Sequence, residues 1–462
     1  MAGIGFQLRK IISRGNLYET IGALVSGVFI VAGPWLISVV AMALLQGFLA
    51  TLKVEHLIVF QVVVVYSYAF SLSLFSALHH HFTRIIADLV WESRHGEAAS
   101  WMLRFLLLAV VLSLAIAIPV SFIIPLQIGN DEHLFRMGIT ALFTVINILW
   151  IIMLFISLLK QYLIILLVFL GGMGISVFTA PILAQQYGVA GALLGYTGGL
   201  AVIDVFFLTI ALVKYPPKKP EQGWKTFWQY LGTYGGLIAS GFFFYAGQWL
   251  DKLFFWFFKG ETIQGIGLKV FPAYDYTVYI AGLSIIPGLV YFVIIAETQI
   301  YIDTRHFLFT LTHTPWTKIQ IAKQKLLSSL KNELKDQSLL QGFCTLGFGF
   351  LLYLYGPESL KNPIMALSLA AAFFQFTLMT VLVYLYYFEL YQQAMVTALL
   401  YFILNGPIAG LIYWLIPLLL PGAGHLASGA IATYFGYHLL KTNTRKIEKI
   451  LFLRALGMKK SS

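Results

Sequence analysis

The chain has 462 residues, of which 59% are hydrophobic and 11% charged, and its mean hydropathy is +0.84. A water-soluble protein of this size could not bury so much apolar surface, which excludes a soluble globular protein and indicates a bilayer as the solvent. The formal net charge of +11 would suit a nucleic-acid-binding protein, unless the basic residues follow a membrane topology instead.

Twelve stretches of the chain are apolar for about the 20 residues that a helix needs to cross a bilayer. The first six cover residues 20–46, 57–78, 105–127, 138–158, 161–184 and 188–212, and the second six cover residues 229–256, 275–298, 340–356, 364–388, 396–420 and 424–440. The break at Leu159-Lys160-Gln161 and the short last stretch leave an odd number open. We expect an all-α membrane protein with about twelve transmembrane helices.

The basic residues are distributed unevenly among the segments that join these stretches. With the N-terminus in the cytoplasm, 24 of the 30 lysines and arginines fall on the cytoplasmic side, as the positive-inside rule requires. The positive charge therefore reflects topology, predicts that both termini are cytoplasmic, and leaves no nucleic-acid partner.

Prolines and lysines cluster at one place between the predicted spans, the linker KYPPKKPEQGWK at residues 214–225. Six spans on each side of it predict two six-helix lobes, the common plan of secondary transporters. The predicted organisation is an interfacial N-terminal segment (1–19), an N-terminal lobe (20–213), a cytoplasmic linker (214–228), a C-terminal lobe (229–440) and a basic cytoplasmic tail (441–462).

The sequence lacks the usual signs of catalysis and cofactor binding. No GxxxxGK[ST] or HExxH motif occurs, and the longest segment outside the membrane, about residues 299–339, is too short for a catalytic domain. The run His79-His80-His81 could hold a metal, but no carboxylate or cysteine stands at ligand spacing, so interfacial polar residues are the favoured interpretation. Cys344 stands alone in an apolar run. We expect no enzyme, no metal site and no cofactor.

Residues 314–337 predict a basic amphipathic helix. Thr314 suits its N-cap and Pro315 its first helical position. An apolar stripe recurs at three- and four-residue steps, with lysines on the other faces; it consists of Ile319, Ala322, Leu326, Leu330 and Leu334. Such a helix is expected to lie flat on the anionic lipids of the inner leaflet or to dock a cytoplasmic partner, and the two can coexist.

Several blocks of the sequence resemble one family of membrane proteins. They are MAGIGFQLRKII (1–12), VAGPWLISV (31–39), TRIIADLVWE (83–92), GQWLDKLFFWF (247–257) and YDYTVYIAGLSIIPGLVYFVIIAET (274–298). In order and spacing these blocks resemble the PelG-like exporters of Pel exopolysaccharide systems. Those exporters are grouped with the polysaccharide transporters of the multidrug/oligosaccharidyl-lipid/polysaccharide flippase superfamily. One departure is local, because QIYIDTRHFLFTL, which follows span eight, is less aromatic than the resemblance leads us to expect.

The resemblance implies a MATE-like fold with two six-helix lobes in the bacterial inner membrane. It also implies export of a nascent polysaccharide rich in N-acetylhexosamine, made by a separate cytoplasmic glycosyltransferase. Further membrane partners implied by it include a receptor for cyclic di-GMP. Two other functions stay open: a proton- or sodium-coupled drug or cation antiporter of the same superfamily, and a non-transporting scaffold of a synthase complex. Such antiporters commonly use an acidic residue in span one, which has none here (20–46), so the exporter is favoured.

The stretch GFFFYAGQWLDKLFFWFFKG, residues 241–260, sets an acid beside a base in an aromatic span. On a helix, its candidate transport-path residues share one face or lie next to it: Tyr245, Gln248, Trp249, Asp251, Lys252 and Trp256. Their rings can support the apolar faces of sugars, and their polar groups can bind hydroxyls. The other interpretation is an outer aromatic belt, with Asp251 paired to a neighbouring helix. Adjacent residues point about 100° apart, so Asp251 and Lys252 are not expected to neutralise each other.

Span six holds another acid in an apolar run, Asp204. It could couple transport to protons or hydrogen-bond across a helix interface; polar residues of other spans that could partner it are Asn147, Gln375 and Asn405. Upstream, Gly191, Gly195 and Gly199 form two GxxxG steps, which allow close helix packing. In span one, Pro34 predicts a kink and is the candidate hinge.

Overall fold

The computed structural model describes residues 9–10, 17–52, 54, 56–127, 131–159, 162–221 and 223–455. These residues are mostly helical, with one short pair of strands. Most of the predicted interfacial segment (1–19), the predicted break at residues 160–161 and the end of the predicted tail (456–462) lie outside the described residues.

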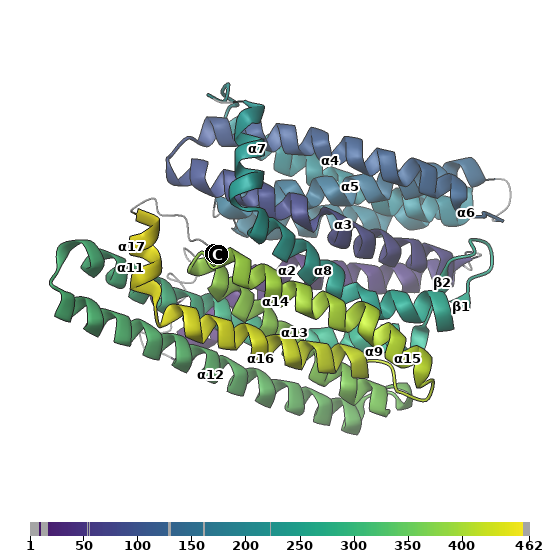
Figure 1. Cartoon of the computed structure of the whole chain (residues 1–462). Coiled ribbons are helices and arrows are strands. Elements are labelled where there is room, and N and C mark those ends of the chain that lie inside the picture. The colour runs from purple at the N-terminus through teal and green to yellow at the C-terminus, as the bar shows by residue number, and fades with distance from the viewer. Residues whose placement is uncertain are drawn as a thin grey trace. The chain divides into compact units, whose positions relative to one another are not determined.

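One compact unit runs from Ala32 to Pro272, and we call it the first unit. Its elements are most of α2 (Leu17–Thr51), then α3 (Leu57–Trp91), α4 (His95–Ile123), α5 (Glu132–Leu158), α6 (Tyr162–Lys214), α7 (Trp224–Thr233), α8 (Gly235–Phe254), η1 (Phe255–Lys259), β1 (Glu261–Thr262) and β2 (Lys269–Val270). Helix α5 packs between α4 and α6, and α3 packs against α4, α5 and α8 (Figure 1). The two strands pair in antiparallel register.

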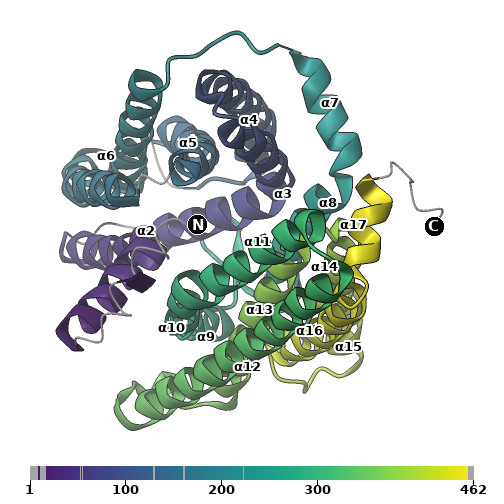
Figure 2. The same ribbon diagram turned by 90° about the vertical axis from the view of Figure 1, so that its left-hand side faces the viewer.

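The second unit comprises the described residues up to Val31 and those from Ala273 onward. Its elements are α9 (Pro272–Leu283), α10 (Ile286–Tyr291), η2 (Phe292–Ala296), α11 (Glu297–His313), α12 (Trp316–Tyr355), η3 (Glu358–Leu360), α13 (Pro363–Tyr387), α14 (Tyr391–Ile403), η4 (Leu404–Ile408), α15 (Ala409–Leu415), α16 (Ala423–Thr444) and α17 (Ile447–Ala455). Helix α16 packs against α13 and α14, and α11 and α12 form a long antiparallel hairpin (Figure 2).

Helix α6 is two helices joined at Tyr187 and Gly188, where the backbone leaves helical geometry. Gly188 has φ of +55°, in the left-handed region that favours glycine. The chain turns back there, and the two halves of α6 meet so closely that a Cβ on Gly195 would lie 2.4 Å from the Cα of Ala180. The close packing predicted from the GxxxG steps is confirmed, and the partner is the preceding half of the same element.

In the part of the chain that the structure describes, nine helices are long and apolar enough to cross a membrane. One of them is α6, which carries two of the predicted spans. Helices α8 and α16 lie outside that set but are 20 and 22 residues long and correspond to predicted spans seven and twelve. Predicted span seven (229–256) is interrupted at Tyr234, where α7 ends and α8 begins. The predicted class, an all-α multi-pass membrane protein, is confirmed.

The compact units and the predicted lobes divide the chain at different places. The units divide after Val31 and after Pro272, whereas the predicted lobes divide at the linker (214–228). Helix α8 belongs to the unit of the first spans because it packs along α3. The six-helix lobes stay a prediction about topology. Pro34, the candidate hinge, lies within α2, three residues beyond the first of these divisions.

The expectation that the amphipathic segment lies flat on the membrane is wrong. Helix α12 runs uninterrupted from Trp316 to Tyr355 and so joins this segment to predicted span nine. One continuous helix cannot both cross a bilayer and lie along its surface. The predicted apolar stripe, from Ile319 to Leu334, is buried within the protein, in the part of α12 that pairs with α11. The sequence identified the stripe correctly, but protein covers it instead of lipid.

Candidate functional site

Helices α3 and α8 of the first unit bring the predicted sugar-contacting stretch against a polar helix. They approach closely at Gly241, where a Cβ would lie 2.2 Å from Nδ1 of His80. Tyr245, one turn further along α8, sets its ring 6.0 Å from the His80 ring. We call the side chains that meet along this contact the α3–α8 face. Glycine at the close approach lets the two helices bring aromatic and polar groups together.

Asp251 and Lys252 pair directly, contrary to the expectation from helix geometry. Lys252 Nζ donates to Asp251 Oδ1 over 2.9 Å and to the backbone carbonyl of Gln248 over 2.8 Å. The Asp251 side chain is fully buried and that of Lys252 is 8% exposed. The long lysine side chain folds back along the helix, which offsets the 100° between adjacent residues. The pair neutralises two charges that would each be costly to bury alone.

Trp256 lies at the other end of the α3–α8 face. Its ring stacks on that of Tyr66 from α3, with centroids 4.5 Å apart and an interplanar angle of 17°. Tyr66 donates its hydroxyl to the carbonyl of Lys269 over 2.5 Å, which fixes the ring. Trp249 lies 6.0 Å from Trp256 and is half-buried, whereas Trp256 is buried. A buried Trp256 does not fit an outer aromatic belt, whereas for Trp249 the belt interpretation stays open.

The structure thus brings most of the predicted stretch together on one helix and its neighbour. Tyr245, Gln248 and Trp249 are half-buried and combine rings with hydrogen-bonding groups, while the ion pair lies within the same helix. A sugar needs both kinds of contact. That these side chains line a transport path stays a prediction. The sequence reasoning missed Tyr66, although polar and aromatic residues recur through the whole of predicted span two.

The histidine run is mostly buried within the protein, and its place relative to the membrane interface stays a prediction. Helix α3 continues to Trp91, beyond the predicted end of span two, so the histidines lie within the helix. His79 and His81 are buried, and the His81 ring packs 4.3 Å from that of Phe227. Their ring atoms Nε2 have no hydrogen-bond partner among the described residues. Within those same residues no cluster of three or more histidine, cysteine, aspartate or glutamate side chains could hold a metal.

Asp204 lies on the second half of α6 and is buried. Neither carboxylate oxygen has a hydrogen-bond partner among the described residues. Tyr68 of α3 lies close enough to interact with it electrostatically, and its hydroxyl is 3.2 Å from that of Tyr196. Asn147, one of the predicted partners, instead accepts a hydrogen bond from Ser71 over 2.7 Å. A role of Asp204 in proton coupling stays a prediction.

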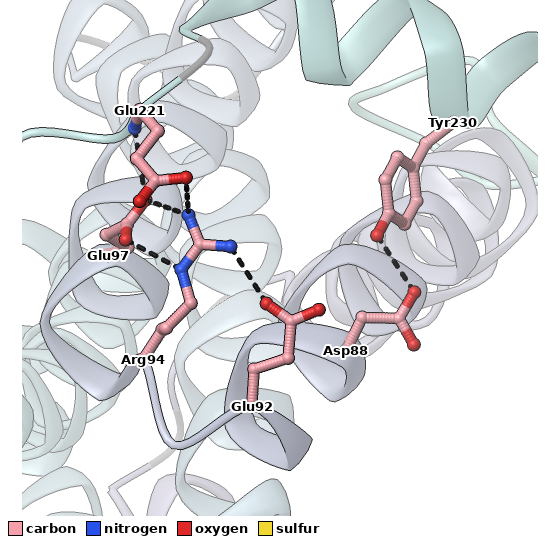
Figure 3. Close-up of polar contacts among 6 residues, drawn as sticks. All are labelled: Asp88, Glu92, Arg94, Glu97, Glu221 and Tyr230. Carbon is pink, nitrogen blue, oxygen red and sulfur yellow. Dashed lines mark hydrogen bonds and ion pairs between the residues drawn. The ribbon is translucent and has the colours of Figure 1, made fainter.

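A second polar cluster holds the linker, and we call it the linker cluster (Figure 3). Arg94, in the turn between α3 and α4, donates to Glu97 over 2.8 and 2.9 Å and to Glu92 over 2.8 Å. It also pairs with Glu221 of the linker over 2.9 Å. The hydrogen bonds with Glu97 have the largest effect, and the one with Glu92 the next largest. Both raise the pKa of the Arg94 guanidinium above its ordinary value. Three carboxylates around one cation anchor the linker to the α3–α4 turn.

Helix α7 is joined to α3 beside this cluster. Tyr230 donates its hydroxyl to Asp88 over 2.9 Å (Figure 3). Asp88 also pairs with Arg84 over 3.0 Å. Arg84 in turn lies 4.4 Å from the ring centroid of Tyr234. Burial and the neighbouring Asp88 carboxylate raise the pKa of the Tyr230 phenol well above its ordinary value. A polar cavity of about 210 Å³ separates this pair from Arg94 and its partners. The prolines and lysines of the linker are visible in the sequence, but no sequence pattern indicates its anchor at Arg94.

The family comparison covers nearly the whole chain. The model of the PelG family of exopolysaccharide exporters (EPS-E) matches residues 1–452. Among curated proteins, no sequence matches the chain.

Solved structures similar to this fold include transporters. A MOP-superfamily transporter from Pyrococcus furiosus is 11% identical to this chain, with a TM-score of 0.59. The match covers 91% of this chain and 96% of the transporter. A MATE protein bound to MaL6 is 12% identical with a TM-score of 0.62, covering 92% and 97%. The MATE transporter ClbM, solved with Rb⁺, is 13% identical with a TM-score of 0.57, covering 94% and 98%. At these identities the likeness shows the fold, which confirms the expected MATE-like architecture.

Proposed function

The chain belongs to the PelG family of exopolysaccharide exporters, and from this premise we propose that it moves a nascent, N-acetylhexosamine-rich polysaccharide across the bacterial inner membrane. The observation that carries the proposal is the family match from residue 1 to residue 452, on a fold shared with MOP-superfamily transporters. The family and the fold are those of transporters, which supports the proposal that another protein makes the polymer.

We propose that the α3–α8 face contacts the polymer. Half-buried Trp249 and Tyr245 can stack on the apolar faces of sugar rings, and Gln248 can bind hydroxyls. Because Asp251 and Lys252 pair with each other, the two add no net charge to this part of α8. A neutral, amphipathic surface suits a sliding polymer, because each sugar must be bound weakly enough to leave.

The partners follow from the division of labour within the proposed system. We propose that a separate cytoplasmic glycosyltransferase feeds the growing polymer to the chain, and that a receptor for cyclic di-GMP belongs to the same membrane assembly. Both termini and the linker would then be cytoplasmic, in agreement with the distribution of lysine and arginine.

A second candidate function is a proton- or sodium-coupled drug or cation antiporter. It is favoured by the likeness in fold to MATE transporters and by the buried carboxylate of Asp204, which has no hydrogen-bond partner among the described residues. The absence of an acidic residue from span one (20–46) speaks against it. In the exporter, Asp204 would instead couple polymer movement to the proton gradient.

The test compares Trp249→Ala with wild type in cells that lack the native chain. We expect secreted polymer per membrane-inserted protein to fall, because a stacking ring is lost while the fold is kept. Trp228→Ala is the matched control, because this tryptophan is 66% exposed on α7, away from the α3–α8 face. An unchanged ratio for Trp249→Ala would remove the α3–α8 face from the transport path.

A further inference from the structure

The hairpin of α11 and α12 is too long to lie entirely within the membrane. The apolar run of α12, residues 339–355, is about 26 Å long at 1.5 Å per residue, close to the thickness of the bilayer core. The remaining stretch, residues 316–338, continues the same helix for about 34 Å. Even at a tilt of about 40°, the whole 40-residue helix spans about 46 Å along the membrane normal, so its far end would lie about 16 Å beyond a hydrocarbon core about 30 Å thick. The headgroup layer is only about 5–8 Å thick.

The projecting part of the hairpin is held together by buried polar contacts. Asp303 of α11 is buried and accepts hydrogen bonds from Ser329 of α12 over 2.6 Å and from Gln299 over 2.8 Å. Lys323 of α12 pairs with Glu448 of α17 over 2.6 Å. These contacts and the buried apolar stripe make the hairpin a stiff arm that presents its tip in a defined position.

The tip of this arm exposes large apolar side chains to water. Phe309 is 59% exposed, Trp316 57% and Ile321 66%. The Phe309 ring also stacks on that of His313, with centroids 4.5 Å apart. Because the tip lies beyond the headgroups, lipid cannot cover these groups. Large apolar side chains exposed to water near one end of a helical hairpin are typical of a surface that binds another protein.

The exposed charges on the hairpin are mostly positive, which favours a partner with an acidic surface. Five of its basic residues are exposed against one exposed acid, Asp336; the basic residues are Arg305, Lys318, Lys325, Lys331 and Lys335. Complementary charge speeds association and selects partners. We infer that the tip of the α11–α12 hairpin is a docking surface for a soluble protein with an acidic surface around an apolar centre. The inference rests on the proposed function in one respect, because it takes that protein to be the glycosyltransferase that makes the polymer.

The binding test uses the purified chain in lipid nanodiscs and, as the probe, the purified glycosyltransferase of the same exopolysaccharide system. The triple variant Phe309→Ser/Trp316→Ser/Ile321→Ser is expected to bind at least about tenfold more weakly than wild type, because interface aromatic anchors dominate affinity. Trp228→Ser is the matched control and is expected to bind as wild type does. Lys318→Glu is expected to weaken binding more at low salt than at high salt. Equal affinity of wild type and the triple variant, or no binding by wild type, would overturn the inference.

A second test separates protein docking from membrane contact. The sole cysteine, Cys344, allows a Cys344→Ser/Trp316→Cys chain to carry one environment-sensitive dye at the tip. We expect water-like emission in vesicles of anionic lipid and a blue shift only when the glycosyltransferase is added. A blue shift with vesicles alone would place the tip in lipid and refute the inference. Normal polymer export by the triple variant would also refute it while leaving the proposed function intact, whereas export that continues without the chain would refute the proposed function instead.

Discussion

The ion pair of Asp251 and Lys252 gives the sharpest stability prediction. Its atoms are 2.9 Å apart, and the side chains are 0% and 8% exposed. Asp251→Asn leaves the Lys252 ammonium buried without its carboxylate. Breaking a buried pair in this way costs about 3–5 kcal/mol, whereas replacing both partners by uncharged groups is often neutral. At about 1.4 kcal/mol per factor of ten, the single substitution raises the unfolded fraction at least a hundredfold.

The assay measures membrane-inserted protein and the thermal unfolding midpoint in detergent. Asp251→Asn is expected to lower both, and the double variant Asp251→Asn/Lys252→Met is expected to recover most of the loss. Secreted polymer per inserted protein then isolates function: it falls in the double variant if the pair contacts the polymer and stays at the wild-type value if the pair only stabilises the helix. A single variant as stable as wild type would refute the argument that the pair is buried and mutually dependent.

Three further predictions test other parts of the molecule. Asp204→Asn is expected to keep protein abundance and abolish the dependence of export on the proton gradient, measured as secreted polymer with and without a protonophore; persistent dependence removes Asp204 from coupling. Arg94→Ala is expected to release the linker and speed its cleavage by trypsin several-fold in the detergent-solubilised protein, and an unchanged rate would mean that the linker cluster is not the anchor. Reporter fusions are expected to read cytoplasmic after residues 220 and 325 and periplasmic near residue 131; a periplasmic signal at 325 would contradict the predicted topology and the hairpin docking surface together.

The class of the protein could be predicted because the thickness of the bilayer fixes the length of the apolar runs that cross it. A run of about 20 apolar residues has few uses other than crossing a membrane. The two halves of α6 were predicted as separate spans, 161–184 and 188–212, and their close packing was predicted because the approach at Gly195 leaves no room for a side chain.

What could not be predicted depends on which surfaces cover one another. The apolar stripe from Ile319 to Leu334 is the same pattern whether lipid or α11 covers it, so the sequence alone could not choose between them. Helical angles separate the backbone positions of Asp251 and Lys252 but do not limit where a four-carbon side chain can reach. Arg94 and Glu221 are far apart in the sequence, and no local pattern indicates that they meet.

Polymer secretion in cells with and without this chain tests the central claim most directly. The measurement is the amount of exopolysaccharide outside the cells, with tolerance to cationic drugs recorded in parallel. The account predicts that deleting the chain abolishes secretion, that the wild-type chain restores it, and that drug tolerance does not change. Undiminished secretion without the chain, or a loss of drug tolerance alone, would contradict it.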